Sequence, residues 1–276
     1  MIVRLWGTRG SVASPGPETV RYGGNTSCVE VRAGDSILVL DAGTGVRRLG
    51  TTLRGYRGRI DLLLTHLHLD HLQGIGFFEP CFRPDIELHI WGPPSPTLNL
   101  RERMSRYLSP PLFPVLLRDL GSRVTLHDVP AEPFSVGPFT ILGEPIIHPG
   151  PTVGYRITAD ERTCAYLPDH EPALGARTFP LAPDWTSGHR LAAGADLLIH
   201  DGQYTDDEYA ARIGWGHSSI EQTWAFARQA GVRQLVTFHH DPGHGDDQLD
   251  RVEADLQARD GPEMVGGREG AEFRLE

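Results

Sequence analysis

The most informative part of this sequence is THLHLDHLQG, at residues 65–74. It follows a short apolar run, residues 60–64, broken only by Asp61, as is typical of a buried strand. Where that strand should end, four metal-capable side chains follow within six residues: His66, His68, Asp70 and His71. Open α/β folds place their chemistry at the carboxyl ends of strands. The stretch therefore predicts a metal site, and two ions are the first hypothesis.

The spacing His-x-His-x-Asp-His resembles the signature of the metallo-β-lactamase superfamily. That resemblance implies an α/β fold of the αββα sandwich type, with two mixed β-sheets flanked by helices. In the family this motif divides its ligands between two ions. His66 and His68 would bind the first metal, and Asp70 and His71 the second. We expect residues 1–276 to form a single hydrolase domain of this type.

The resemblance implies three more ligands, and the sequence offers one near the end of each of three later apolar stretches. His148 follows Ile146-Ile147 and would be the third ligand of the first metal. Asp169 follows residues 165–168 and matches the carboxylate that bridges the ions. His239 follows residues 235–238 and would complete the second site. His240 and His244 crowd the same loop, and we choose His239 because it comes first after the apolar run.

A further histidine, His217, lies just before a predicted helix. We expect Ser218 to be the N-cap of that helix and Glu221 to complete a capping box. A histidine here resembles the catalytic-histidine segment of the ribonuclease Z and phosphodiesterase branch, which uses it as a proton donor to the leaving oxygen. The alternative is an ordinary solvent-exposed histidine before a helix.

Other polar residues at strand ends are candidates to support the metal ligands. Asp41 lies in an Asp-x-Gly-x-Gly turn that also resembles the superfamily, and we expect its carboxylate to hold a metal-binding histidine. Gly43 and Gly45 should let the backbone turn tightly there. His200 and Asp201 follow another apolar run and are predicted to contact the ligands, with a purely structural role as the alternative. Four histidines without a supporting pattern are expected to be structural or exposed: His89, His127, His170 and His189.

The composition bears on partners and compartment. A net charge of −10 disfavours a long nucleic acid as substrate, because gripping a polyanion needs a basic field. The segment 91–120 contains Arg101–Leu108, which we interpret as an amphipathic helix or a lid over the cleft. We expect a cytoplasmic protein with no membrane span, and three buried thiols at Cys28, Cys81 and Cys164. Dimerisation is common in the branch that the chain resembles, so a homodimer is a further expectation.

Proline and glycine are densest at residues 80–114 and 130–151, which we interpret as long loops around the site. The C-terminal part is predicted to contain a helix at about Asp247–Ala258 and a short strand at Glu272–Leu275.

These patterns together predict a dinuclear metal-dependent phosphodiesterase, with two Zn²⁺ ions, or alternatively Mn or Fe. Asp70 and Asp169 would hold the ions that activate water, and His217 would act as general acid. The expected substrate is a small phosphodiester, such as a cyclic nucleotide or a cyclic ribose phosphate. The alternatives are a ribonuclease Z-like RNA-processing nuclease and a non-catalytic nucleotide-sensing module on the same fold.

Overall fold

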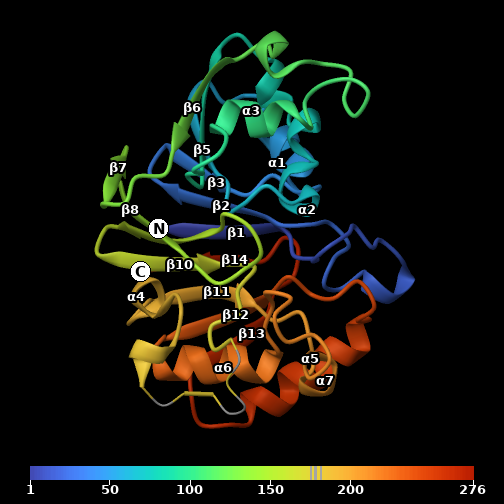
Figure 1. The fold of residues 1–276 in the computed structure, drawn as a ribbon, viewed down its shortest axis with the longest axis vertical. Coiled ribbons are helices and arrows are strands. Elements are labelled where there is room, and N and C mark those ends of the chain that lie inside the picture. Colours follow the sequence, from blue (N-terminus) through green and yellow to red (C-terminus); the bar gives the residue numbers. More distant parts are fainter. Residues whose placement is uncertain (175, 177–178, 181) are drawn as a thin grey trace.

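The computed structural model of the chain describes residues 1–174, 176, 179–180 and 182–276. Two seven-stranded sheets pack against each other (Figure 1). The strands of the first sheet are β1 (Ile2–Gly7), β2 (Cys28–Ala33), β3 (Ser36–Leu40), β4 (Gly58–Leu63), β5 (Ile86–Gly92), β6 (Arg123–Asp128) and β14 (Glu272–Arg274). Those of the second are β7 (Phe134–Val136), β8 (Phe139–Pro145), β9 (Val153–Ala159), β10 (Arg162–Leu167), β11 (Leu197–Asp201), β12 (Gln234–Phe238) and β13 (Glu263–Gly266).

Helices cover the outer side of each sheet (Figure 1). On the side of the first sheet lie α1 (Val46–Thr52), α2 (Leu69–Leu72) and α3 (Leu100–Ser105). On the side of the second lie α4 (His189–Ala192), α5 (Asp206–Tyr209), α6 (Ile220–Gln229) and α7 (Asp246–Gln257). Single 3₁₀ turns are η1 (Pro17–Thr19), η2 (Ile75–Phe77), η3 (Glu79–Phe82), η4 (Leu117–Asp119) and η5 (Pro183–Trp185). The predicted αββα sandwich is confirmed.

Both sheets are mixed, and their strand patterns match. The first has the order β14-β1-β2-β3-β4-β5-β6, with β3 to β6 parallel and the remaining pairs antiparallel. The second has the order β13-β12-β11-β10-β9-β8-β7, with β10 to β13 parallel. Each sheet therefore has parallel strands whose carboxyl ends deliver loops to one edge.

The core has three layers, as this architecture requires. Strand alternation assigns each side chain to a layer: on β3, Leu38 and Leu40 pack between the sheets, whereas Ile37 and Val39 pack under the helices of the first sheet. A third cluster lies between the second sheet and its helices and includes Leu235 and Phe226. The two-sided burial explains why these strands are nearly continuous apolar runs.

The proline-rich segments are more regular than predicted. Residues 80–114 contain η3, β5 and α3, and residues 130–151 contain β7 and β8, so neither is one long loop. Helix α3 begins with a complete capping box between Asn99 and Glu102, and its Leu100 and Met104 are buried in the first outer layer. That burial makes the segment part of the helical layer rather than a lid. The C-terminal helix and strand are present, each within one residue of prediction.

Candidate metal centre

The seven predicted metal ligands come from four connections, each of which follows a strand of one of the two sheets. Strand β4 ends at Leu63 and leads through Thr65 to His66, after which α2 carries Asp70 and His71. In the second sheet, Asp169 follows β10 and His239 follows β12, while Asp201 is the last residue of β11. His148 lies in the connection between β8 and β9. All seven predicted ligands lie in two adjoining clusters.

The first cluster consists of His66, His68 and His148, whose ligand atoms lie within 4.8 Å of one another. His148 Nε2 is 3.2 Å from His68 Nδ1. The side chains of His66 and His148 are each 2% exposed, whereas His68 is exposed. Burial lowers the pKa of all three imidazoles. Neutral imidazole is the form that binds a metal, so the cluster is ready to coordinate at neutral pH.

The second cluster consists of Asp70, His71, Asp169 and His239, whose ligand atoms also lie within 4.8 Å of one another. His71 Nε2 is 2.9 Å from Asp169 Oδ1, and His239 Nε2 is 3.1 Å from Asp70 Oδ2. All four residues are buried. The carboxylates of Asp70 and Asp169 therefore meet two imidazoles in a closed space.

Asp169 stands between the clusters. Its Oδ2 is 3.7 Å from both His66 Nε2 and His148 Nε2 in the first cluster. The same oxygen is 3.4 Å from His239 Nε2 in the second. One carboxylate thus faces ligand atoms from both groups, which is the arrangement expected of a bridging ligand.

The donor set fits divalent cations. One ligand atom, His66 Nε2, is buried without a hydrogen-bond partner among the described residues. Burial alone would raise the pKa of Asp70 and of Asp169, yet the neighbouring histidines hold both pKa values below the usual range. Burial lowers the pKa of His71, but the surrounding carboxylates raise it overall. Ionised carboxylates that attract positive charge this strongly, beside unpaired imidazole nitrogen, suit a bound cation.

A second set of residues orients the ligands. Asp41 Oδ2 accepts a hydrogen bond from His71 Nδ1 at 2.8 Å and another from the Tyr166 hydroxyl at 2.9 Å, and its Oδ1 accepts one from the Thr65 amide at 2.8 Å. His148 Nδ1 lies 2.8 Å from the Gly216 carbonyl, to which it donates. Such contacts fix the tautomer and would leave the other ring nitrogen available to a metal. Asp41 therefore lies where the sequence predicted support.

The backbone beside the ligands adopts rarely populated conformations. Asp41 and His239 have φ of 57° and 60°, in the left-handed region that non-glycine residues seldom adopt. The chain turns at Gly43 and Gly45 as expected, but neither glycine has a positive φ. Gly43 is needed for close packing instead, since a Cβ there would lie 2.3 Å from the Asp70 carbonyl oxygen.

His217 and Asp201 form a dyad beside the second cluster. His217 Nδ1 is 2.7 Å from Asp201 Oδ2, and the His217 ring stacks on that of His239 with centroids 5.0 Å apart. Burial lowers the pKa of His217, but the charge and hydrogen bond of Asp201 raise it to about 9. The side chain of His217 is only 12% exposed, which does not fit an ordinary surface histidine. Asp201 is also held, by the amides of Gln203 and Ser218.

The N-cap prediction was wrong by one residue. Ser219 caps α6 by accepting a hydrogen bond from the Gln222 amide. Ser218 instead donates from its hydroxyl to the His170 carbonyl, so it braces the dyad rather than the helix. Glu221 is accordingly not part of a capping box, and it pairs with Arg259.

Three neighbouring histidines lie outside the clusters. His200 contacts no predicted ligand; its ring bonds to the Asp201 carbonyl, to Thr223 and to His170, so the expected contact with the ligands is not observed. The His240 side chain points away from the clusters, and its Nε2 lies 2.9 Å from the Gly267 carbonyl oxygen. His244 pairs with Glu208. Of the histidines after β12, His239 alone faces the clusters in the part of the chain that the structure describes.

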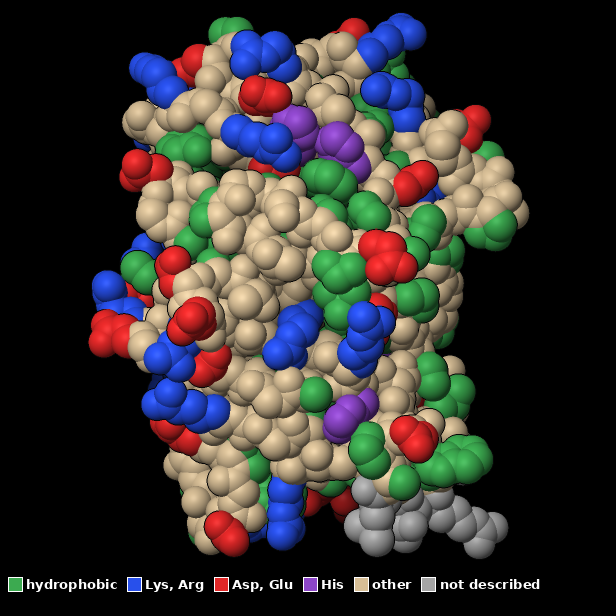
Figure 2. All heavy atoms as spheres, turned by 90° about the vertical axis from the view of Figure 1, so that its left-hand side faces the viewer, with side chains coloured by type: hydrophobic (Ala, Val, Ile, Leu, Met, Phe, Trp, Pro, Cys, Tyr) green, Lys and Arg blue, Asp and Glu red, His purple; other side chains and the backbone are tan. Residues whose placement is uncertain are grey.

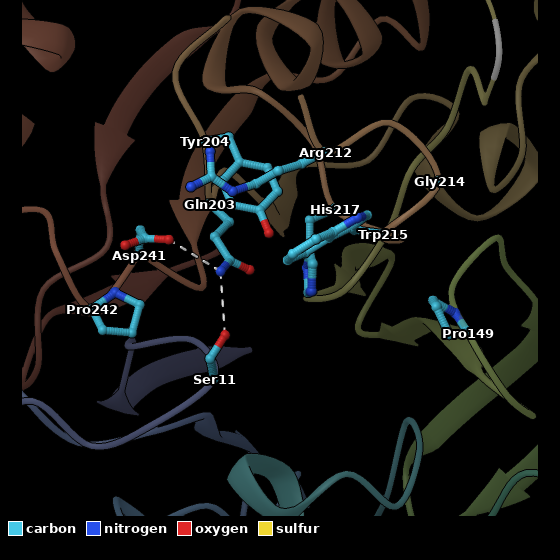
Figure 3. Close-up of a pocket in the computed structure, with 10 residues that line it drawn as sticks. All are labelled: Ser11, Pro149, Gln203, Tyr204, Arg212, Gly214, Trp215, His217, Asp241 and Pro242. Carbon is cyan, nitrogen blue, oxygen red and sulfur yellow. Dashed lines mark hydrogen bonds between the residues drawn. The ribbon is translucent and has the colours of Figure 1, made fainter. Parts of the chain in front are cut away.

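A cavity of about 640 Å³ opens beside the dyad (Figure 3). His217 lines it, and the His217 ring stacks on that of the predicted ligand His239. The other residues that line it are Ser11, Pro149, Gln203, Tyr204, Arg212, Gly214, Trp215, Asp241 and Pro242.

Several of the supporting residues were not predicted. Gln203 Oε1 lies 3.2 Å from His239 Nδ1, and the Ser11 amide donates to Asp70 Oδ2 at 2.8 Å. The guanidinium of Arg9 is buried and donates to carbonyls at Gly23, Asp241 and His244, which ties down the loop after β12. None of these residues follows an apolar run or matches a motif. The one local signal was the position of Gln203, two residues after Asp201.

The two clusters suit divalent metals, and the chain's family and relatives show a metal-dependent hydrolase. The family model described as Beta-lactamase superfamily domain matches residues 37–240, and the chain belongs to this superfamily. A relative from Mycobacterium avium (strain 104) named ribonuclease Z is 31% identical over 268 residues, 87% of this chain and 86% of its own.

Two solved structures share the fold at low sequence identity. The crystal structure of human tRNase Z, short form, has a TM-score of 0.70 at 20% identity and covers 100% of both chains. A diphosphatase from the PhnP family has a TM-score of 0.68 at 18% identity, covering 100% of this chain and 98% of its own. None of the helices in the described residues has the length and hydropathy needed to span a membrane.

Proposed function

We propose that this protein is a dinuclear metal phosphodiesterase that hydrolyses a small phosphodiester. The observation that carries the proposal is the pairing of two ligand clusters, joined at Asp169, with a histidine dyad at the mouth of a cavity. His66, His68 and His148 would hold one ion, and Asp70, His71 and His239 the other. Zn²⁺ suits these ligands, as do Mn²⁺ and Fe.

When bound, such ions supply Lewis acidity that makes water nucleophilic near neutral pH and screens the charge that develops on phosphoryl oxygens. The chain contributes the remaining parts of the reaction. Asp169 fixes the two halves of the centre relative to each other. Asp41 and the Gly216 carbonyl hold His71 and His148 in the orientation that the ions require.

His217 would protonate the leaving oxygen. Asp201 accepts from its Nδ1, which keeps the ring in one orientation and favours the protonated form. The His217 ring is held through Nδ1, and the side chain lines the cavity. An alkoxide is a poor leaving group unless it is protonated, so hydrolysis of a phosphodiester needs the proton that His217 can donate.

The second candidate is an RNA-processing nuclease of the ribonuclease Z type. The similarity to the Mycobacterium avium ribonuclease Z favours it, since it extends over 87% of the chain. Charge favours the small substrate. The net charge of −10 opposes the basic field that binding a polyanion needs. Acidic and basic side chains are also intermixed on the face that Figure 2 shows, which is the side of the chain termini rather than that of α2 and α5.

A substrate panel separates the two candidates. The protein, loaded with Zn²⁺ or Mn²⁺, is assayed with 2′,3′-cyclic nucleotides, a cyclic ribose phosphate, linear diesters and a precursor transfer RNA. We expect metal-dependent turnover of at least one small diester, lost in Asp169→Ala. Cleavage of the RNA without turnover of any small diester would favour the nuclease, and no turnover of either would remove both candidates.

A further inference from the structure

Trp215 combines an exposed side chain with a firmly held backbone. Its side chain is 60% exposed, although large apolar groups are costly to leave in water. The residues on each side are anchored by Glu171, which is fully buried: the amides of Gly214 and Gly216 donate to its carboxylate at 3.0 Å and 2.9 Å. The Tyr209 hydroxyl donates to the same carboxylate at 2.7 Å. The indole is therefore presented by a rigid loop.

This loop also carries His217, two residues further on. Trp215 and His217 line the same cavity, and Figure 3 shows the indole beside the imidazole, with Tyr204, Gln203 and Asp241 on the other side of the opening. The group that receives a proton from His217 must lie in this cavity, because a general acid has to be within hydrogen-bond distance of the leaving oxygen. The cavity is therefore the place for the leaving group.

The remaining lining indicates what kind of leaving group fits. Arg212 lies over the Tyr204 ring, 5.0 Å from its centroid, and donates to the Glu208 carbonyl. Asp241 accepts from Gln203 at 3.3 Å, and Gln203 also donates to Ser11. Apart from His217, the lining thus has one cation, Arg212, and one anion, Asp241. Because these two charges are opposite, the lining suits a neutral, polar ligand with several hydroxyl groups better than a second phosphate.

We propose that this cavity is a nucleoside subsite in which Trp215 stacks on the base of the leaving group. The inference rests on the proposed phosphodiesterase function and narrows its substrate to diesters, linear or cyclic, whose leaving oxygen belongs to a nucleoside. An exposed indole on a fixed loop offers a flat surface for stacking at little entropic cost. The polar side chains opposite can bond the sugar hydroxyls and the base edge. A volume of about 640 Å³ is within the range of small-molecule sites.

Two matched substrates test the inference: the methyl phosphodiester of adenosine, joined at the 5′ oxygen, and the same diester of ribose without a base. The wild type should prefer the substrate with the base. In Trp215→Ala the ratio of the two kcat/KM values should fall by roughly five- to a hundredfold, the usual worth of stacking one base. Trp215→Phe should restore most of it. Trp185→Ala, which removes another exposed indole outside the cavity, should leave the ratio unchanged.

A binding measurement keeps the inference separate from the proposed activity. Adenosine is titrated calorimetrically into the wild type and the Trp215 variants, with ribose as the base-free ligand. Weaker adenosine binding in Trp215→Ala, with recovery in Trp215→Phe, supports the subsite whether or not a diester is turned over. Equal hydrolysis of both diesters by the wild type and Trp215→Ala would overturn the subsite and leave the phosphodiesterase standing. Absence of adenosine binding by the wild type would overturn the subsite as well.

Discussion

Asp169 is the residue that faces both ligand clusters. Its two oxygens face ligand atoms from each cluster, so its loss should disturb both sites, whereas any single histidine belongs to one. We predict that Asp169→Ala lowers the metal content from close to two ions per chain to well under one, measured by elemental analysis after dialysis.

The matched control for Asp169→Ala is Asp201→Ala. Asp201 is equally buried and ends the neighbouring strand, but it contacts His217 rather than the ligands. This variant should keep its metal. If both variants lost metal to the same extent, or if Asp169→Ala retained both ions, the bridging role would be wrong.

His217 is predicted to act on the leaving group and not on the metals. His217→Ala should slow a diester with an alkoxide leaving group by roughly 10²–10⁴-fold, the usual contribution of a positioned general acid. Bis(p-nitrophenyl) phosphate, whose leaving group departs without a proton, should be slowed far less. Steady-state kinetics on both substrates, with metal content measured in parallel, checks this. Equal losses on the two substrates, or loss of metal, would return His217 to a binding role.

At the scale of elements, apolar runs in the sequence predicted individual strands because those strands are buried on both faces, whereas the αββα sandwich was predicted from the resemblance to the superfamily. A parallel strand that is buried on both faces has an almost continuous apolar sequence. The predicted ligands follow the end of such a run, as His66 follows the strand that ends at Leu63. The same signal located Asp169 and His239. Register and layer order then bring these ends together, and no local pattern encodes that step.

The supporting residues were harder to predict, because they act through backbone geometry. Glu171 holds the loop of His217 by accepting from two glycine amides, a contact that depends on the path of residues 209–216. Ser218 and Ser219 are both suitable N-caps, and the choice between them follows from the bond of Ser218 to the His170 carbonyl. Such tertiary contacts override the local capping preference.

Gly216 lies in the loop that carries His217, and its carbonyl accepts a hydrogen bond from His148 of the first cluster. This contact gives a prediction of its own. Gly216 has φ of 88°, and a Cβ there would lie 2.6 Å from His148 Nδ1 and 2.3 Å from Pro149 Cδ. We predict that Gly216→Ala displaces His148 and weakens binding of one metal ion at least tenfold, as expected when support for a ligand is lost. Metal affinity is measured by competition with a chromophoric chelator.

Gly231→Ala is the matched control for this turn. Gly231 also has a positive φ, 65°, but a Cβ there would meet no atom within 4 Å. The control therefore adds similar backbone strain without touching a ligand. It should lose some stability and keep its metal affinity. Equal metal affinities in the two variants would show that the turn does not position His148.

At the scale of the whole molecule, both sheets contribute residues to the candidate metal centre. The first sheet and its α2 supply His66, His68, Asp70 and His71, and the second supplies the remaining ligands and the dyad. The sheets are also tied at the site by hydrogen bonds: the Tyr155 hydroxyl donates to the Leu64 carbonyl, and the Tyr166 hydroxyl to Asp41. Neither sheet alone carries all seven predicted ligands, so the whole sandwich must fold before both clusters can form.

Folding of the whole molecule also buries His200 in its neutral form, which predicts loss of stability in acid. Burial lowers the pKa of His200 from 6.5 to about 4. As the pH falls from about 6.5 to 4, the unfolded chain takes up a proton at this residue before the folded protein does. The free energy of unfolding should therefore decrease over this range, by up to about 1.4 kcal/mol per pH unit for the one group. Above pH 6.5 the contribution is complete and constant.

Comparison with His200→Gln isolates this contribution, because other acid-sensitive groups, including the metal ligands, are common to both proteins. Urea unfolding at several pH values between 4 and 7 gives the free energy of unfolding of each. The glutamine variant should be less stable near neutral pH, since its side chain cannot reproduce the bonds to Thr223 and His170. Its stability should nevertheless fall less steeply below pH 6.5, so that the two curves converge as the pH approaches 4. Parallel curves of unfolding free energy against pH would contradict the prediction, because they would mean that His200 has the same pKa in the folded and the unfolded protein. We expect different pKa values, because folding buries His200 completely against His170 and Phe226.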